Sequence, residues 1–358
     1  MKDFLITNDL SKRIISIRFL LIILVVFIHN NPTEIYFSTK IQFFSIPTYV
    51  GIIVELISII ISGIAVPLLF LISGYLLYAK NEMFIIVLQK KIKTILLPYV
   101  IWNVLTVLLF FIAQSFDFTK PYFESNIIRD FRFIDWIDIF AGKFTALRHY
   151  QYPMVYQFWF LRDLFILNLL FVIIKKIINQ CPCLVFFTFF ILWISNLNIY
   201  IVSTEALLFF SLGYYIVKYS LDYKTLDKIK PYDVIAIYIL TIIGELFFKD
   251  ELMIIHKINI IIGSVLIIKL SLKFISNDSL FKKLAWLEKY AFFVFAIHGM
   301  VLAIIQKLSV LIIPMYNGWL LLQYFGVTIV GIIFSIILGM IIKKLFPRVY
   351  GLLTGGRS

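Results

Sequence analysis

The chain alternates between long apolar runs and short polar segments. A helix that crosses a bilayer needs about 20 mostly apolar residues. Six runs meet or approach this length, at 14–30, 57–79, 95–115, 183–200, 290–306 and 319–342. Weaker runs, each with a charge near one end, lie at 158–174, 203–217, 232–248 and 253–269. The pattern therefore predicts an all-α polytopic membrane protein with about ten transmembrane helices.

The distribution of basic residues predicts the orientation of these helices. With ten spans, most of the 33 Lys and Arg residues fall in loops on the side of the two termini. Because basic residues concentrate in cytoplasmic loops, we expect both termini to be cytoplasmic. The segment 116–156, in which aromatic and charged residues alternate, is then a long non-cytoplasmic loop that rests on the outer membrane surface. We expect one membrane domain over residues 1–358.

The composition supports a membrane protein and excludes several other classes. The chain is 62% hydrophobic and 15% charged, whereas soluble proteins are about 45–50% apolar and about 25% charged. The net charge of +13 lies in short loops, so we expect no nucleic-acid binding. The first apolar run lacks a small-x-small cleavage site, and we interpret it as a retained span. Cys181 and Cys183 have no neighbouring histidine, so we expect no metal site.

Two ionisable residues in the first predicted span, Arg18 and His29, are the clearest functional candidates. On a helix they lie about 20° apart around the axis and about 16 Å apart along it. That spacing suits a long ligand with an anionic head and a reactive tip, and histidine is the natural general base at neutral pH. Two alternatives remain open. Arg18 can be a topogenic residue that reaches the membrane interface, and His29 can be an interfacial residue.

Other polar residues within the spans allow two interpretations each. Arg162 and Asp163 either shape an acceptor site or form structural ion pairs, and as adjacent residues they point about 100° apart, so we expect no direct bridge between them. His298 lies in the middle of a span, where it is either part of a substrate-binding site or an interior histidine whose hydrogen bonds are satisfied within the protein. Ser73 and Gly74 are predicted to allow close packing of helices.

Several segments resemble, in order, the acyltransferase 3 family of membrane-bound acyltransferases. RIISIRFLLIILVVFIHN (13–30) resembles the family's opening helix, in which Arg or Lys is followed by ten residues and then His, as Arg18 and His29 are here. The later matches are VPLLFLISGYLLY (66–78), KKIKTILLPYVIW (90–102), FWFLRDLFILNLL (158–170), FFSLGYYI (209–216), YAFFVFAIHGMVL (290–302) and GLLTGGR (351–357). The resemblance covers about the whole chain. Many members carry an Arg-x-x-Arg pair before the third helix, where this chain has Lys91 and Thr94, so a bidentate phosphate contact does not carry over.

The resemblance implies transfer of an acyl group, usually acetyl, from cytoplasmic acyl-CoA to a hydroxyl of an envelope or secreted glycan or its lipid-linked precursor. It also implies a bacterial inner membrane as the location and no permanently bound cofactor. On this reading His29 is the catalytic base, and Arg18, Lys90, Lys91 and Lys93 bind the donor. The acceptor residues would be Trp159, Arg162, Asp163 and His298.

Two alternatives to this activity remain open at this point. One is a small-molecule transporter, which would show two related halves, and the other is an acyl-group carrier without its own transferase chemistry. The acceptor sugar, the acyl chain, the side of the membrane where the acceptor is modified and the oligomeric state are not predicted from the sequence.

Overall fold

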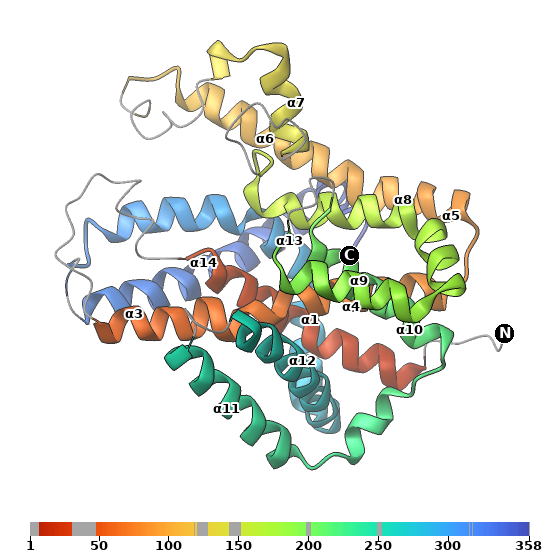
Figure 1. The fold of residues 1–358 in the computed structure, drawn as a ribbon. Coiled ribbons are helices and arrows are strands. Elements are labelled where there is room, and N and C mark those ends of the chain that lie inside the picture. Colours follow the sequence, from red (N-terminus) through yellow and green to blue (C-terminus); the bar gives the residue numbers. More distant parts are fainter. Residues whose placement is uncertain are drawn as a thin grey trace.

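The structure, a computed structural model, describes residues 7–30, 48–117, 119, 128–142, 152–197, 202–248, 253–314, 316 and 318–357. Within these ranges the chain forms helices and no strands, which confirms the predicted all-α class. The helices are α1 (Asn8–Ile28), α3 (Thr48–Glu55), α4 (Ala65–Ala79), α5 (Phe84–Lys91), α6 (Leu97–Ala113), α7 (Phe133–Ala141), α8 (Trp159–Gln180), α9 (Pro182–Ile194), α10 (Thr204–Lys218), α11 (Pro231–Phe248), α12 (Met253–Ser276), α13 (Asp278–Ser309), α14 (Trp319–Leu345) and α15 (Pro347–Thr354). Figure 1 shows their arrangement.

Each of the ten predicted segments falls on a helix. Seven helices among the described residues are long and apolar enough to cross a membrane: Thr48–Ala79, Phe84–Ala113, Tyr156–Gln180, Pro231–Phe248, Ile254–Ser276, Asp278–Ser309 and Trp319–Leu345. The first helix, α1, is not among them because it carries Lys12, Arg13 and Arg18, and α9 and α10 are short. The chain is therefore a multi-pass membrane protein, while the total of ten spans and the side of the termini stay predictions.

Two predicted boundaries differ from the structure for local reasons. Within the predicted segment 183–200, helix α9 ends at Ile194, because Asn196 adopts a positive φ of 48°. Helix α13 begins well before residue 290, because the Asn277 side chain accepts a hydrogen bond from the Leu280 backbone N–H and caps the helix there. The polar first turns of α13 thus extend beyond its apolar stretch.

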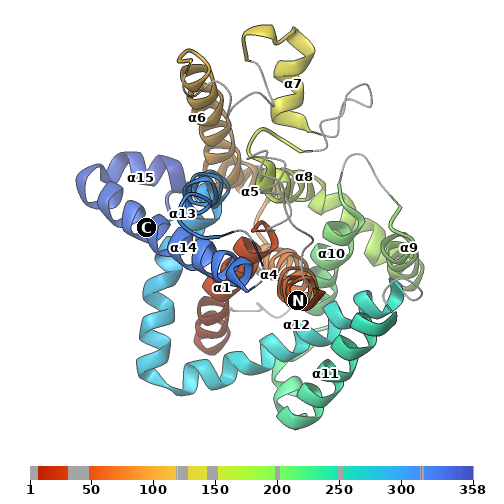
Figure 2. The same ribbon diagram turned by 90° about the vertical axis from the view of Figure 1, so that its left-hand side faces the viewer.

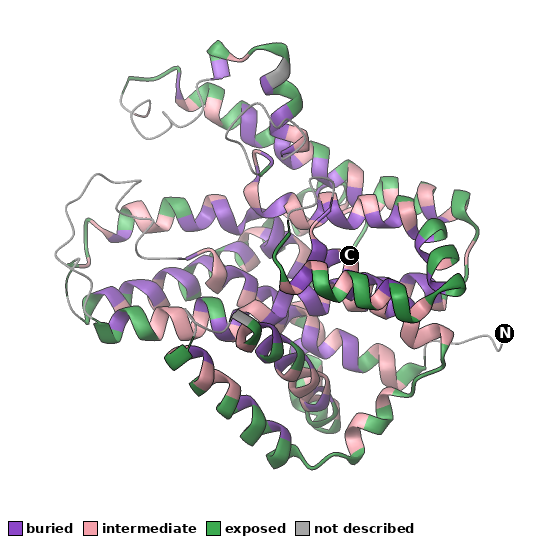
Figure 3. Cartoon of the chain, in the orientation of Figure 1, coloured by how far each residue is buried: buried purple, intermediate pink, exposed green. Residues whose placement is uncertain are grey.

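Helices α1 and α4 occupy the centre of the molecule, and the remaining long helices surround them (Figure 2). Helix α1 packs against α4, α12 and α13. Buried side chains gather along these central helices, while exposed residues cover the outer faces (Figure 3). Many exposed residues are large and apolar, such as Leu240 of α11 and Ile333 of α14. An apolar outer face is what a lipid environment requires.

The tightest helix contact joins α4 to α10 and depends on two glycines. A Cβ on Gly74 would collide with the backbone oxygen of Phe210, and a Cβ on Gly213 would lie 2.7 Å from the carbonyl carbon of Gly74. The two backbones approach this closely because neither residue has a side chain. This confirms the prediction that Gly74 allows close packing of helices.

Candidate active site

The site is built around His29, the residue that ends α1. Its ring lies 4.8 Å from that of Tyr156, edge to face, and 5.3 Å from that of His298, measured between ring centroids. Tyr156 belongs to a short 3-10 turn, Tyr156–Phe158, directly before α8, and His298 belongs to α13. Three segments far apart in the sequence therefore bring two imidazoles and a phenol together.

The hydrogen bonds of His298 define which of its ring nitrogens carries a proton. Nδ1 lies 2.7 Å from the backbone oxygen of Phe295, and a ring nitrogen facing a carbonyl oxygen must donate. In the neutral ring Nε2 is then an acceptor. His298 is only 1% exposed, and Nε2 has no hydrogen-bond partner among the described residues. A buried, unpaired acceptor is costly and calls for a functional explanation.

Two polar residues that the sequence did not suggest line α13 beside this histidine. A Cβ on Gly299 would lie 2.8 Å from Oε1 of Gln157 and 3.1 Å from the hydroxyl of Tyr156. Gln157 is buried and donates from Nε2 to the backbone oxygen of Ala296. The sequence did not indicate Tyr156 and Gln157 as site residues, because their three-residue turn is too short to show a hydrophobic periodicity. We call His29, Tyr156, Gln157 and His298 the histidine cluster.

The position of His29 is set by the residue that follows it. Asn30 is buried, and its Nδ2 donates to the backbone oxygen of Tyr324 at 2.7 Å and to Oγ1 of Thr328 at 2.8 Å. Its Oδ1 accepts from Nε2 of Gln306 at 2.7 Å. The end of α1 is therefore tied to both α13 and α14, and the His29 ring is held against α13.

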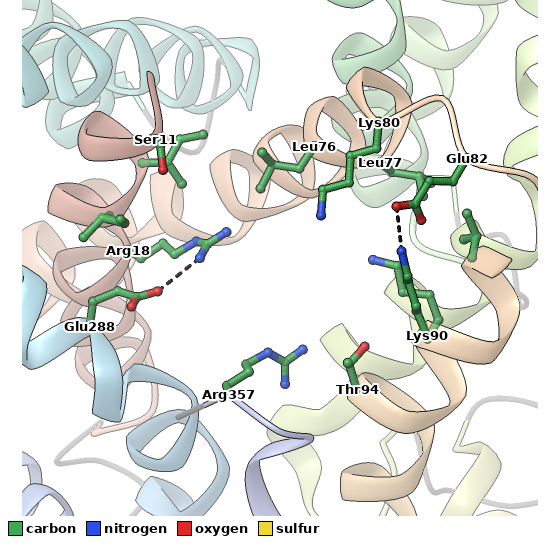
Figure 4. Close-up of a pocket in the computed structure, with 14 residues that line it drawn as sticks. Ser11, Arg18, Leu76, Leu77, Lys80, Glu82, Lys90, Thr94, Glu288 and Arg357 are labelled. Atoms are coloured by element: carbon green, nitrogen blue, oxygen red, sulfur yellow. Dashed lines mark hydrogen bonds and ion pairs between the residues drawn. The ribbon is translucent and has the colours of Figure 1, made fainter. Parts of the chain in front are cut away.

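A second feature lies at the opposite end of α1, where a cavity of about 540 Å³ opens between α1, α4, α5, α13 and the C-terminal tail. Figure 4 shows the charged side chains that line it. Its basic residues are Arg18, Lys80, Lys90, Lys91 and Arg357, and its acidic residues are Glu82 and Glu288. We call it the cationic cavity.

Ion pairs occupy both carboxylates of the cationic cavity. Nη1 of Arg18 lies 3.1 Å from Oε1 of Glu288, and Nζ of Lys90 lies 2.6 Å from Oε1 of Glu82. Lys80, Lys91 and Arg357 have no carboxylate partner in the part of the chain that the structure describes. The lining therefore carries excess positive charge and suits an anionic ligand.

The structure brings together three of the four predicted donor residues, namely Arg18, Lys90 and Lys91. Lys93 does not line the cavity: Ile92–Leu96 forms a π-helical turn, and Thr94 takes the lining position. Lys80, Glu288 and Arg357 were missed by the sequence analysis because they come from three distant parts of the chain.

The cationic cavity and the histidine cluster share two helices, α1 and α13. At one end, Arg18 of α1 pairs with Glu288 of α13. Eleven residues further along α1, the His29 ring contacts that of His298, which lies ten residues beyond Glu288 on α13. Because both contacts keep the same order, the two helices run in the same direction, and the two sites are about 15 Å apart along them. A ligand that occupies both sites must be extended.

The remaining predicted acceptor residues connect helices. Trp159 begins α8, and its ring lies 6.3 Å from that of Phe70. The expectation that Arg162 and Asp163 do not bridge is wrong: Nη2 and Nε of Arg162 donate to Oδ1 of Asp163 at 2.8 and 3.0 Å. The long arginine side chain folds back across the 100° separation on the helix.

The same pair ties α8 to its neighbours. Nη1 of Arg162 donates to the backbone oxygen of Ala141, the last residue of α7, and Oδ2 of Asp163 accepts from the backbone N–H of Ser203, the residue that caps α10. The Asp163 side chain is fully buried, and that of Arg162 is 9% exposed. These contacts are those of the structural ion pair that the sequence left as one alternative.

A protein-family model described as an acyltransferase domain matches residues 12–342, nearly the whole chain. The matched range includes Arg18, His29 and His298, whereas Arg357 lies beyond its end. No curated protein matches the chain. No solved structure matches it either.

Proposed function

Because the chain belongs to the acyltransferase 3 family of membrane proteins, we propose that it transfers an acyl group from acyl-CoA to a hydroxyl of an envelope or secreted glycan or of its lipid-linked precursor. Acetyl is the acyl group we expect. The observation that carries the proposal is the placement of a cationic cavity and a histidine cluster on the same two helices.

The cationic cavity supports binding of the donor. Coenzyme A carries phosphate groups at one end and its reactive sulfur at the other. Arg18, Lys80 and Lys91 offer positive charge to the phosphates. The reactive thioester then extends along α1 and α13 toward the histidine cluster, about 15 Å away.

The histidine cluster supports the chemistry. His29 takes the proton of the acceptor hydroxyl as the oxygen attacks the thioester carbonyl carbon. The new carbon–oxygen bond forms, the carbon–sulfur bond breaks, and the imidazolium returns the proton to the coenzyme A thiolate. Nε2 of His298, the acceptor nitrogen of that ring, can hold the N–H of His29 in place, so that the other nitrogen of His29 faces the acceptor hydroxyl. The tetrahedral intermediate needs a donor for its oxyanion, and the hydroxyl of Tyr156 lies in this cluster.

A direct test compares ester-linked acyl groups on the envelope glycans of cells that express the wild-type protein or His29→Gln. Mass spectrometry of the purified glycans should show acylation with the wild type and its loss with the variant. His256→Gln is the matched control, because His256 on α12 pairs with Glu245 on α11 and not with a residue of the cluster. A carrier or transporter without transferase chemistry would leave glycan acylation unchanged by His29→Gln, and that result would refute the proposal.

A further inference from the structure

The last residues of the chain return to the cationic cavity after α15. Gly355 and Gly356 follow the helix with φ of 65° and 75°, a left-handed conformation that favours glycine. A Cβ on Gly355 would lie 2.7 Å from the backbone oxygen and 2.8 Å from the Cα of Thr94. The tail therefore packs directly against the backbone of the turn that carries Thr94, in the cavity wall.

Contacts on both sides hold the Arg357 side chain in the cavity wall. Its guanidinium carbon lies 4.2 Å from the centre of the Phe292 ring, a cation–π contact. Nη1 donates to the backbone oxygen of Thr354 at 3.1 Å, and Oγ1 of Thr354 donates to the backbone oxygen of Arg357 at 3.2 Å. Figure 4 shows the guanidinium pointing into the cavity, between Glu288 and Thr94.

This guanidinium forms no ion pair with a carboxylate among the described residues. Glu288 is engaged by Arg18, and Glu82 by Lys90. Arg357 is exposed through the open cavity, but the protein packed around its guanidinium and the nearby charge of Arg18 lower the pKa of this group to about 10, against an opposing effect of Glu288. The guanidinium is still protonated at neutral pH. A positive charge that is held in place without an acidic partner favours an anion in the cavity.

The geometry favours a phosphate as that anion. A guanidinium presents parallel N–H groups that bind two phosphate oxygens at once, whereas an ammonium offers a point charge. The other basic side chains without a carboxylate partner here, Lys80 and Lys91, are both ammonium groups. Phe292 and Thr354 hold Arg357 in place, so little side-chain freedom is lost when a ligand binds.

We propose that Arg357 binds a phosphate group of the acyl donor, so that the C-terminal tail completes the donor site. The inference rests on the proposed function, in which the cationic cavity takes acyl-CoA. It adds a specific residue that lies outside the matched range 12–342 and is delivered by the tail.

Isothermal titration of coenzyme A into the purified full chain, in nanodiscs of phosphatidylcholine, tests this proposal. Arg357→Ala should weaken coenzyme A binding by about ten-fold or more, the usual effect of losing charge-assisted hydrogen bonds. The affinity of Arg357→Lys for coenzyme A should lie between those of the wild type and Arg357→Ala, because lysine keeps the positive charge but lacks the parallel N–H groups of the guanidinium. Arg348→Ala is the matched control, because Arg348 is an exposed arginine on α15 that does not line the cavity.

A second variant moves the guanidinium without removing it. Gly355→Ala places a Cβ against the Thr94 backbone at a positive φ, so it should displace the tail and weaken coenzyme A binding as Arg357→Ala does. A single symmetric size-exclusion peak for each nanodisc-embedded variant, at the elution volume of the wild type, shows that the variant is folded and not aggregated.

The outcomes separate the inference from the proposed function. If the wild type binds coenzyme A and Arg357→Ala binds it equally well, the role of Arg357 is refuted and the function stands. If the wild type binds no coenzyme A, both are refuted. Nanodiscs that contain phosphatidylglycerol test whether Arg357 binds the phosphate of a lipid instead of that of the donor. If native mass spectrometry shows that Arg357→Ala loses bound phosphatidylglycerol while its affinity for coenzyme A is unchanged, the inference is also refuted.

Discussion

The imidazole rings of His29 and His298 lie 5.3 Å apart, centroid to centroid, at an interplanar angle of 31°. One ends α1 and the other lies within α13, with its Nδ1 committed to the backbone oxygen of Phe295. The only acceptor that His298 can offer to a ligand or to His29 is therefore Nε2. Two histidines that the sequence treats as separate candidates thus form one site.

The first prediction concerns the base. His29→Gln keeps a hydrogen-bonding side chain but cannot accept a proton at neutral pH. Since general-base catalysis contributes about 10²–10⁴ in rate, acyl transfer should fall by at least about 100-fold while coenzyme A binding stays within two-fold of the wild type, about 0.4 kcal/mol.

Wild-type transfer should also decrease as the pH falls below the pKa of His29, because only the neutral ring acts as a base. Steady-state rates and calorimetric titrations measure the two effects, and near wild-type transfer by the variant would place the base elsewhere.

The second prediction concerns coupling between the two histidines. His298→Gln removes the Nε2 acceptor and should lower the transfer rate by about ten-fold or more, as expected when a hydrogen bond to a reacting group is lost. If His298 acts through His29 or on the same hydroxyl, the double variant should be barely slower than His29→Gln alone. A double-mutant cycle on the transfer rate checks this. Fully additive losses would show that the two rings act independently.

The third prediction concerns the donor and the ion pair of Arg18. Arg18→Ala should raise the KM for acyl-CoA by about ten-fold or more, since a charge-assisted contact to phosphate is lost. Lys91→Ala should have a milder effect, because neighbouring cations remain. Lys93→Ala, outside the cavity lining, is the control and should leave KM unchanged.

Glu288→Gln should act in the opposite direction to Arg18→Ala. The Glu288 carboxylate competes with a phosphate for Arg18, so its removal should lower the KM for acyl-CoA. Initial-rate kinetics over a range of donor concentrations distinguish the two directions. A higher KM for Glu288→Gln would show that the carboxylate positions Arg18 for the donor.

The fourth prediction is the topology with cytoplasmic termini. In a background with Cys181 and Cys183 replaced by serine, a cysteine at Lys224 or Arg348 should be protected from a membrane-impermeant maleimide in intact cells. A cysteine at Arg132, beside α7, should be labelled. Labelling of position 348 from outside would overturn the orientation. The sequence alone suggests three further labelling positions, Lys40, Lys143 and Ser358. These residues lie outside the described part of the chain.

The fifth prediction concerns stability at the contact of α4 and α10. Gly74→Ala places a methyl group against the Phe210 backbone, and overpacking of this kind costs about 1–3 kcal/mol. The unfolding temperature of the detergent-solubilised protein should fall. Gly326→Ala on α14 is the control, because its added methyl group meets nothing within 4 Å. Equal unfolding temperatures for the two variants would show that the backbones separate at little cost.

The sequence by itself determined the helices, the membrane class and the family. Long apolar runs specify transmembrane helices because a backbone in lipid must satisfy its own hydrogen bonds, and this requirement is local. The spacing of Arg18 and His29 is likewise local, since it follows from the rise of one helix. Even the early start of α13 has a local signal in Asn277, which the apolar pattern alone does not reveal.

Only the tertiary structure decided which of these groups meet. His298 reaches His29, Glu288 reaches Arg18, and the tail delivers Arg357 to the same cavity, although each pair is separated by most of the chain. The ion pair of Arg162 with Asp163 likewise depends on a side-chain rotamer and on partners from α7 and α10. No local period encodes such contacts, because they depend on how whole helices pack and on close approaches like that of Gly355 to Thr94.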